Sequence, residues 1–517
     1  MYSTSSLKRK SLRYQYFLWV ILLLLAACSR TNEPPNSDEA PSPLPPEVNV
    51  ENTPLPTEEF EPAPTPSPEV SPSPTSIDLS IPLYTHMGIE LVGSNFIEKI
   101  PLAAEAGAGW VRMNGVFWAQ IEPTEGARNW ETAADFEVRA QAISEAGMKL
   151  IAIVRRTPEW AQAVPGYYCG PVLPDKLQAF GMFLHDLVAR YSQPPFNVKY
   201  WELGNEPDIA PTISPPDQVF GCWGDETDPY YGGGYYAEML NAAYPQIKAA
   251  DPDAQVLVGG LLLDCNPIDP PIQASGESKD CTPSRFLEGI LLNGGGDYFD
   301  GVSFHAYDFY SPEANIFGNL SWQGSSEQFN QVPASLAKAN YLRALLALYG
   351  YENKFLINTE TALLCGRGQD DPECTEETFE IAKANYVAMS YTVAKAENFR
   401  ANVWYHYQKG WRFSGLTSSD LQPHPALTAY RFASQVFEGA FLRETIKDYD
   451  NLFGYKFLKS STEGEIEIWV VWSLDGNAFS VTLPDEPVTV YNVFGEEMPP
   501  SQILEVGASP LYLQWMP

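Results

Sequence analysis

The segment VKYWELGNE, residues 198–206, largely decides the fold of this chain. It is a β-rich run of large apolar residues that ends in the polar pair Asn205 and Glu206, followed by Pro207. A second segment of the same kind, KFLINTE at residues 354–360, ends in Glu360. Both are typical of buried strands that carry a glutamate at the carboxyl end.

The chain around these two segments alternates between strand and helix patterns. Eight β-rich runs occupy residues 85–91, 110–116, 149–154, 198–206, 254–260, 299–307, 354–360 and 401–407. The helical patterns after them cover residues 96–107, 131–147, 175–191, 235–250, 284–293, 333–349, 377–394 and 426–437. Strands that alternate with helices pair in parallel, so the pattern predicts an α/β fold, a (β/α)₈ TIM barrel over residues 81–440. A doubly wound open sheet is the alternative, but no Gly-rich phosphate loop follows the first strand.

The last part of the chain changes character. Residues 464–474, 479–483, 488–495 and 509–515 alternate apolar and polar side chains, with turn residues at Asp475-Gly476 and at Gly495. Short alternating runs separated by turns indicate antiparallel strands. We therefore expect a small C-terminal β-sandwich domain over residues 441–517.

The N-terminus has the pattern of an export signal. Residues 7–13 are basic, and the apolar run at 16–27 is too short for a membrane span of roughly 20 residues. The sequence Leu25-Ala26-Ala27-Cys28 resembles the lipobox of bacterial lipoproteins, which implies removal of residues 1–27 and lipidation of Cys28. An ordinary signal peptide with a chance cysteine is the alternative. Residues 28–80 are rich in Pro, Ser, Thr and Glu, which predicts a disordered linker that lifts an exported domain off the membrane surface.

Cysteine usage agrees with export. Apart from Cys28 there are six cysteines, and an even number in an exported protein indicates disulfides. We expect neighbours in sequence to pair, that is Cys169 with Cys222, Cys265 with Cys281, and Cys365 with Cys374. None of them has the CxxC spacing or a nearby His tract that would indicate a zinc site.

Composition narrows the range of partners. A net charge of −33 argues against a nucleic-acid partner and against docking on anionic lipid through charge. The 13 Trp and 28 Tyr residues are enough to build a large core and also to stack on sugar rings. The membrane is therefore expected to be a partner only through the lipid at Cys28.

The two strand-end glutamates point to a reaction. In a (β/α)₈ barrel, active residues gather at the carboxyl ends of the strands. Glu206 ends the fourth predicted strand and Glu360 the seventh, so they would face each other from nearly opposite sides of the barrel. Two facing carboxylates are what the hydrolysis of a glycosidic bond requires.

At this point the chain resembles the retaining glycoside hydrolases of clan A, and most of all family 39 and its relatives, over residues 85–517. The motifs that carry the resemblance are Trp110-Val111-Arg112, Trp118, Ile121-Glu122-Pro123, Trp160-Ala161, WELGNEPD at 201–208, His305-Ala306-Tyr307, Thr359-Glu360 and Trp404. Two positions depart from the usual pattern: Gly204 stands where many relatives have Trp, and Thr361-Ala362 follows Glu360 in place of a nearby glycine. These departures weaken the assignment to one family and leave the implied mechanism intact.

The resemblance implies a role for each matching residue. Glu206 would be the acid/base and Glu360 the nucleophile. The implied substrate-binding residues are Arg112, which keeps Glu360 ionised, Asn205 at the sugar 2-hydroxyl, His305 lining the site, Tyr307 holding Glu360, Trp404 as the floor under the ring, and Trp118 as a sugar platform. Each also has a structural alternative, such as a satisfied core histidine for His305 or core packing for Tyr307 and Trp404. We take Glu122 to be structural.

The predicted function is therefore a surface-anchored retaining glycosidase that acts on a poly- or oligosaccharide. The alternatives are another clan A enzyme, such as a family 5-type endoglucanase or mannanase, a carbohydrate-binding lipoprotein without turnover, and an envelope scaffold protein. We expect no cofactor, no metal and a monomer.

Overall fold

The computed structural model describes residues 86–215, 220–311, 316–323, 331–366, 374, 377–462 and 464–516. The predicted signal peptide, Cys28 and the linker lie outside these residues. Within them, no helix has the length and apolar character needed to cross a membrane.

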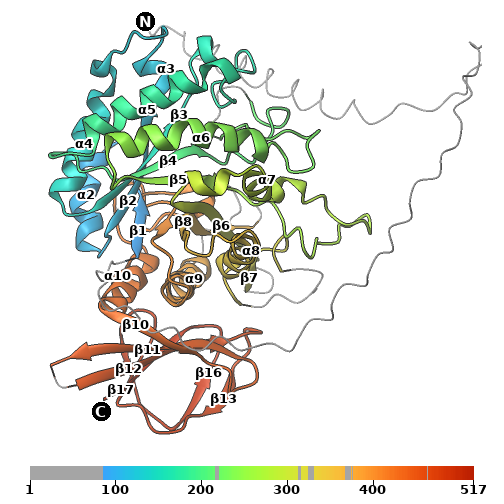
Figure 1. Ribbon diagram of the computed structural model, residues 1–517. Helices are drawn as coiled ribbons and strands as arrows, with labels where there is room; N and C mark the ends of the chain where they lie inside the picture. Colours follow the sequence, from blue (N-terminus) through green and yellow to red (C-terminus); the bar gives the residue numbers. More distant parts are fainter. Residues whose placement is uncertain are drawn as a thin grey trace, which may run out of the picture. The chain divides into compact units, whose positions relative to one another are not determined.

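Eight parallel strands form a closed barrel (Figure 1). They are β1 (Met87–Glu90), β2 (Trp110–Phe117), β3 (Lys149–Arg155), β4 (Tyr200–Asn205), β5 (Gln255–Leu261), β6 (Gly301–Ser311), β8 (Phe355–Cys365) and β9 (Asn402–Trp404). Each strand pairs with its neighbour in sequence, and β9 pairs with β1 to close the ring. The closure excludes the doubly wound open sheet and confirms the predicted barrel. A short strand that was not predicted, β7 (Ile316–Gly318), adds to β6 in antiparallel orientation.

Helices connect the strands, and all of them except the short α3 lie close to where the sequence predicts them. They are α2 (Phe96–Glu105), α3 (Trp118–Ile121), α4 (Ala134–Glu145), α5 (Leu177–Tyr191), α6 (Gly233–Ala250), α7 (Phe286–Leu292), α8 (Ala334–Leu348), α9 (Glu377–Ala396) and α10 (Pro425–Phe437). Gly107 and Gly147 follow α2 and α4 with φ of 94° and 73°. This left-handed conformation ends a helix, and glycine adopts it without a steric penalty.

The inside of the barrel is apolar toward the amino ends of the strands, which we call the lower half; the half toward the carboxyl ends is the upper half. One separate cluster draws a buried side chain from each of six strands: Trp110, Ile151, Tyr200, Leu257, Ile357 and Val403. The opposite face of the same strands packs against the helices in a larger apolar core. The cluster fills the barrel below the carboxyl ends of the strands, so those ends are left for polar side chains.

The C-terminal residues form two antiparallel sheets, as expected for a small sandwich. The larger sheet has the order β10 (Ala440–Thr445), β11 (Leu452–Ser461), β12 (Gly464–Ser473), β17 (Leu511–Trp515), β14 (Thr489–Tyr491) and β15 (Glu497–Met498). The smaller sheet pairs β13 (Phe479–Thr482) with β16 (Ile503–Val506). An apolar cluster that includes Trp469, Val471, Val481, Leu504 and Leu513 joins residues of both sheets. The sequence analysis missed β10, β11, β15 and β16.

The larger sheet packs against the barrel through α10. Phe437 of α10 lies 5.3 Å from Phe457 of β11, measured between ring centroids. The indole of Trp472 on β12 donates to the carbonyl of Gln331 at 2.6 Å, next to α8. These buried aromatic contacts join the sandwich to the barrel on the side of α9 and α10 (Figure 1).

Candidate active site

Glu206 and Glu360 lie together at the carboxyl end of the barrel. Glu206 directly follows β4, and Glu360 lies within β8. One oxygen of each carboxyl group and one ring nitrogen of His305 all lie within 4.8 Å of one another. Both glutamates are buried, at 5% and 8% exposure. The structure thus brings together the two carboxylates that the sequence analysis singled out.

The backbone turns sharply where β4 ends. Gly204 has a φ of 98°, and Glu206 itself has a φ of 50°. A left-handed conformation is uncommon for a residue with a side chain, and such residues are concentrated at functional sites. The amide of Glu206 donates to the carbonyl of Gly260 at 2.8 Å, which fixes the turn against β5.

A bulge in β8 aims Glu360 into the barrel. Phe304 of β6 pairs with Asn358 and His305 with Glu360, so Thr359 is an extra residue on β8. A strand without a bulge would place Glu360 on the face opposite to Ile357, because successive side chains alternate. The extra residue reverses that phase, which is a known use of bulges next to active sites.

Arg112 on β2 connects the polar side chains of the site. Its guanidinium is fully buried and donates through Nε and Nη2 to the two oxygens of Glu202, at 2.9 and 3.0 Å. Nη1 donates to Glu90 at 2.9 Å and also to Glu360. Nη2 donates to Oδ1 of Asn205 at 2.5 Å. Arg112 therefore lies in direct contact with Glu360, as the sequence analysis expected.

Glu90 and Glu202 belong to this cluster, although the sequence analysis did not identify them. Glu90 ends β1 and Glu202 lies in the middle of β4, and both are at most 1% exposed. The amide of Gly260 also donates to Glu202, at 2.8 Å. A Cβ at Gly260 would overlap the imidazole of His305 and lie 2.7 Å from Oε1 of Glu202. An acidic residue inside an otherwise apolar strand was the signal that could have revealed them.

Tyr307 and His305, both on β6, contact the two glutamates. The hydroxyl of Tyr307 donates to Oε2 of Glu360. Nδ1 of His305 lies 2.9 Å from Oε1 of Glu206, and its Nε2 lies 3.5 Å from Oε1 of Glu360. His305 is fully buried, and burial lowers its pKa to about 4, so its imidazole is neutral at pH 7.

Burial and charge give the acids of the site different protonation behaviour. Burial raises the pKa of Glu206 to about 7, against the opposing effect of the Arg112 and Lys338 cations. Burial also raises the pKa of Glu90 to about 8, although Arg112 favours its ionised form. Because its pKa is near 7, Glu206 holds a proton up to about neutral pH, as a general acid that works near neutral pH must.

A second set of charged residues supports the site from behind. Nζ of Lys338 on α8 donates to the carbonyls of Leu262 and His305, both at 2.7 Å. The carboxylate of Asp208 accepts from the amides of Leu262 and Leu263, both at 2.9 Å. These bonds fix the segments that follow β4 and β5 to β6, which carries His305.

Glu206, His305 and Glu360 are also the one group that could hold a metal ion among the residues that the structure describes. Oε1 of Glu360 is already in contact with the guanidinium of Arg112. A cation at this point would meet like charge at short range, which opposes metal binding. The arrangement fits proton transfer and nucleophilic attack better than metal chemistry.

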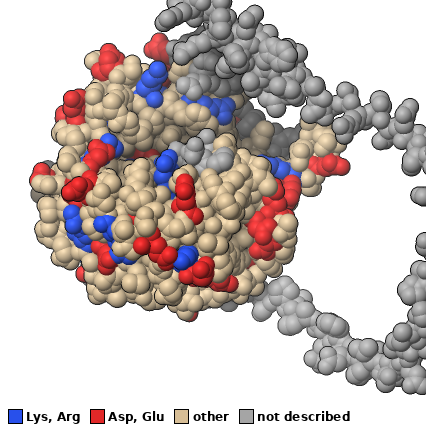
Figure 2. Space-filling view, turned by 90° about the horizontal axis from the view of Figure 1, so that it is seen from above, with Lys and Arg blue, Asp and Glu red and all other residues tan. Residues whose placement is uncertain are grey.

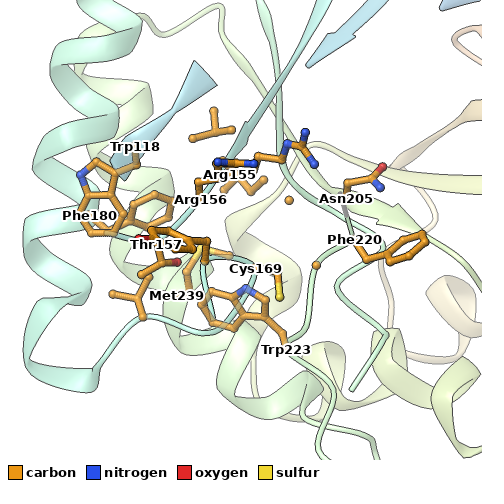
Figure 3. A pocket seen from close by; sticks show the side chains of 16 residues that line it. Trp118, Arg155, Arg156, Thr157, Cys169, Phe180, Asn205, Phe220, Trp223 and Met239 are labelled. Carbon is orange, nitrogen blue, oxygen red and sulfur yellow. The ribbon is translucent and has the colours of Figure 1, made fainter. Parts of the chain in front are cut away.

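A pocket opens beside Asn205, between the loops that follow β3 and β4 (Figure 3). Its wall includes Arg155, Arg156 and Trp223. Trp118 also borders the pocket, but it is only 1% exposed, and its indole donates to Glu122 at 2.9 Å. This contact agrees with a structural Glu122, whereas sugar binding by Trp118 stays a prediction.

The expectation for Trp404 needs a correction. Trp404 is fully buried, and its indole donates to the carbonyl of Ser414 at 2.8 Å, so it cannot form an open floor under a sugar ring. The next residue, Tyr405, lies 6.1 Å from Tyr307 at right angles, measured between ring centroids. Strand alternation explains the difference, because neighbouring residues face opposite sides.

Three disulfides pin the loops around the site. Cys169 is bonded to Cys222, Cys265 to Cys281, and Cys365 to Cys374. These are the pairs expected from sequence order. Three disulfides are typical of proteins that fold outside the cytoplasm.

Comparison with solved structures agrees with this fold. A family 39 glycoside hydrolase from Bacteroides cellulosilyticus WH2 is similar at a TM-score of 0.60 and 18% identity, over 83% of this chain and 81% of that chain. A glucosidase from Croceicoccus marinus is similar at a TM-score of 0.51 and 12% identity, over 84% of this chain and 96% of that chain. A GH30 endoxylanase from Clostridium papyrosolvens C71 is similar at a TM-score of 0.51 and 13% identity, over 83% of this chain and 97% of that chain. No protein-family model and no curated protein matches the chain. The predicted resemblance to family 39 and to other clan A enzymes is thus confirmed for the fold, a TIM barrel with a C-terminal β domain.

Proposed function

We propose that this protein is a retaining glycoside hydrolase, with Glu360 as the nucleophile and Glu206 as the acid/base. The observation that carries the proposal is that one carboxyl oxygen of Glu206 and one of Glu360 lie within 4.8 Å of each other. Retaining enzymes have carboxyl groups about 5–5.5 Å apart, whereas inverting enzymes need roughly 6.5–9.5 Å to admit a water. The different surroundings of the two acids support the same assignment.

In the first step, one oxygen of the Glu360 carboxylate attacks the anomeric carbon, and the bond from that carbon to the leaving oxygen breaks. The carboxylic acid of Glu206 donates its proton to the leaving oxygen, which departs as an alcohol. Contact with Arg112 and Tyr307 orients the carboxyl group of Glu360 for this attack. Because burial raises its pKa to about 7, Glu206 still holds the proton that it donates near neutral pH.

In the second step, Glu206 acts as the base. Its carboxylate takes a proton from a water molecule, whose oxygen attacks the anomeric carbon and displaces Glu360. Asn205 is oriented by Arg112, and in this proposal its amide donates to a hydroxyl of the sugar beside the reacting carbon. His305 keeps Glu206 in place through its contact at Nδ1.

We further propose that the barrel is displayed outside the cytoplasm. In this proposal residues 1–27 are a signal peptide, Cys28 carries the lipid, residues 28–80 are a linker, and a monomeric enzyme of barrel and sandwich acts on a poly- or oligosaccharide. The three disulfides support export. Labelling of cells with a tagged fatty acid tests the anchor, because the label is expected on the protein and not on its Cys28→Ser variant.

The test of the mechanism is trapping of the covalent intermediate. We would incubate the purified protein with 2-fluoro-glycosides that carry activated leaving groups and measure its intact mass. The expected result is an adduct that maps to Glu360 and is absent from Glu360→Gln. Glu206→Gln serves as the matched control, because it should still be trapped by compounds whose leaving group needs no proton.

The same experiment separates the alternatives. An adduct identifies the sugar at the cleavage point, and product analysis then separates a family 39-like enzyme from a family 5-type endoglucanase or mannanase. Absence of any adduct, together with undiminished oligosaccharide binding by Glu206→Gln and Glu360→Gln, would contradict the enzyme and favour a carbohydrate-binding lipoprotein.

A further inference from the structure

Two neighbouring arginines line the pocket beside Asn205, and the mechanism above makes no use of them. Arg155 is the last residue of β3, and Arg156 follows it with a φ of 68°. Figure 3 shows both between Trp118 and Asn205, with Trp223 on the opposite side of the pocket.

Arg155 points toward the reacting groups. Ile151, four residues earlier on β3, belongs to the apolar cluster inside the barrel. Side chains alternate along a strand, so Arg155 shares that inward face at its carboxyl end. Arg155 lines the pocket together with Asn205, the residue that directly precedes Glu206.

One aromatic ring holds both guanidinium groups. The Cζ atoms of Arg155 and Arg156 lie 5.2 and 5.1 Å from the ring centroid of Phe117 at the end of β2. Phe117 pairs with Arg155 in the parallel register of β2 and β3. A stacked guanidinium keeps its N–H groups at the edge of its plane, where they can donate to an anion.

The pocket concentrates positive charge in an acidic protein. The chain carries a net charge of −33, and Figure 2 shows groups of Asp and Glu on the face it displays. None of the sixteen residues that line the pocket is acidic. Within the part of the chain that the structure describes, no carboxylate forms an ion pair with Arg156. Burial together with the neighbouring Arg156 lowers the pKa of Arg155 to about 10, which still leaves it charged at neutral pH.

The rim of the pocket is fixed by covalent and backbone bonds. The disulfide of Cys169 and Cys222 links the loops that follow β3 and β4. The amide of Cys222 donates to the carbonyl of Cys169 at 3.2 Å, and the hydroxyl of Thr157 donates to the carbonyl of Gly170 at 2.8 Å. The two arginines therefore face a site of defined shape.

We infer that this pocket binds an anionic group of the substrate, a carboxylate or a sulfate ester on a sugar next to the cleavage point. The inference rests on the proposed function and adds to it the chemical class of the substrate. The planar fork of an arginine matches the geometry of a carboxylate or a sulfate, and two adjacent forks favour a charged sugar over a neutral one.

The experiment compares charged oligosaccharides with their neutral counterparts. One set comes from pectin, alginate and glucuronoxylan, each beside its carboxyl-reduced form, and a second set comes from carrageenan and chondroitin sulfate, each beside its desulfated form. Dissociation constants are measured by calorimetry with the Glu360→Gln protein, alone and combined with Arg155→Met or Arg156→Met. Arg139→Met is the matched control, because Arg139 stacks on Phe96 at 4.7 Å in another part of the barrel wall.

We expect at least one charged ligand to bind about tenfold or more tightly than its neutral form, because the anion forms charge-assisted hydrogen bonds with the arginines that the neutral form lacks. Both pocket variants should remove that preference, and Arg139→Met should keep it. The set in which the preference occurs distinguishes carboxylate from sulfate. Equal binding of charged and neutral forms in both sets, or a preference that survives both pocket variants, would overturn the inference. Trapping with 2-fluoro-glycosides is scored separately, so a glycosidase without charge preference and a charge-selective binder without turnover give different results.

Discussion

The two halves of the barrel interior use the same strands for opposite purposes. Near the amino ends, Trp110 and Tyr200 belong to an apolar cluster with almost no exposure. Two residues further along the same inward faces stand Arg112 and Glu202, joined by two hydrogen bonds. On each of these strands, the inward face therefore changes from apolar packing to polar, charged side chains within two residues.

This contrast separates stability from function. An apolar side chain stabilises the barrel by its removal from water, whereas a buried charge costs free energy unless its partners compensate for it. Arg112 contacts three buried acidic side chains at once, so the upper half depends on a single cation. Substitutions in the upper half should therefore remove activity first, and those in the lower half should remove stability first.

The largest expected effect is in the upper half, at Glu360. Glu360→Gln should lower turnover by about 10⁴-fold or more, because the nucleophile is lost. The free energy of unfolding should change by only about 1 kcal/mol, because glutamine fills the same volume. Steady-state kinetics with an activated aryl glycoside and urea unfolding measure the two quantities. Retained turnover would contradict the assignment of the nucleophile.

Arg112 should affect both quantities. Arg112→Met leaves Glu202, Glu90 and Glu360 without their shared cation, which should cost about 3–5 kcal/mol of stability as well as activity. Thermal unfolding at neutral pH measures the loss of stability. A variant as stable as the parent would contradict the dependence of this cluster on the Arg112 cation.

The lower half should behave in the opposite way. Ile357→Ala removes a fully buried side chain three residues before Glu360 and should cost about 2–5 kcal/mol of stability. Turnover per folded molecule, with the active fraction counted by the 2-fluoro adduct, should stay within about threefold of the parent. A large loss of turnover in the folded fraction would show that the two halves are coupled.

The barrel itself could be predicted because its signals are local. Each barrel strand is a short β-rich run followed by a helix, and turn glycines such as Gly107 and Gly147 mark the helix ends. The strands β10 and β11 were missed because residues 440–461 mix charged side chains with apolar ones. Two of the missed strands, β15 and β16, are only two and four residues long, too short for an alternation pattern to stand out.

The candidate site could be predicted only as far as its motifs reached. The two glutamates follow from their strand ends, but their meeting depends on the bulge at Thr359, which no sequence pattern marks. Trp404 was placed in the cleft because the motif names the residue and not the face of the strand. Glu90 and Arg155 emerged only when long-range contacts placed them beside Arg112 and Asn205.

A pH titration of stability sharpens the comparison, because only the upper half titrates. The pKa of Glu90 is raised to about 8 by burial, so the stability it contributes is complete below about pH 4.5 and is lost as the pH rises through 8. Glu90→Gln cannot ionise, so its stability relative to the parent should rise between pH 5 and pH 8. Urea unfolding at both pH values checks this. Parallel changes in both proteins would contradict the raised pKa.

The smallest expected effect concerns Lys338, which supports the upper half from behind. Its cation lowers the pKa of Glu206, which burial holds near 7, so Lys338→Met should move the alkaline limb of the kcat/KM profile to higher pH. Lys383→Met is the matched control, because Lys383 is also buried and bonds the carbonyls of Phe413 and Gly415, at 2.9 and 2.8 Å. Both variants should lose stability, but only Lys338→Met should shift the limb. An equal shift in both variants, or in neither, would reduce Lys338 to a packing role and leave the proton of Glu206 controlled by burial and Arg112 alone.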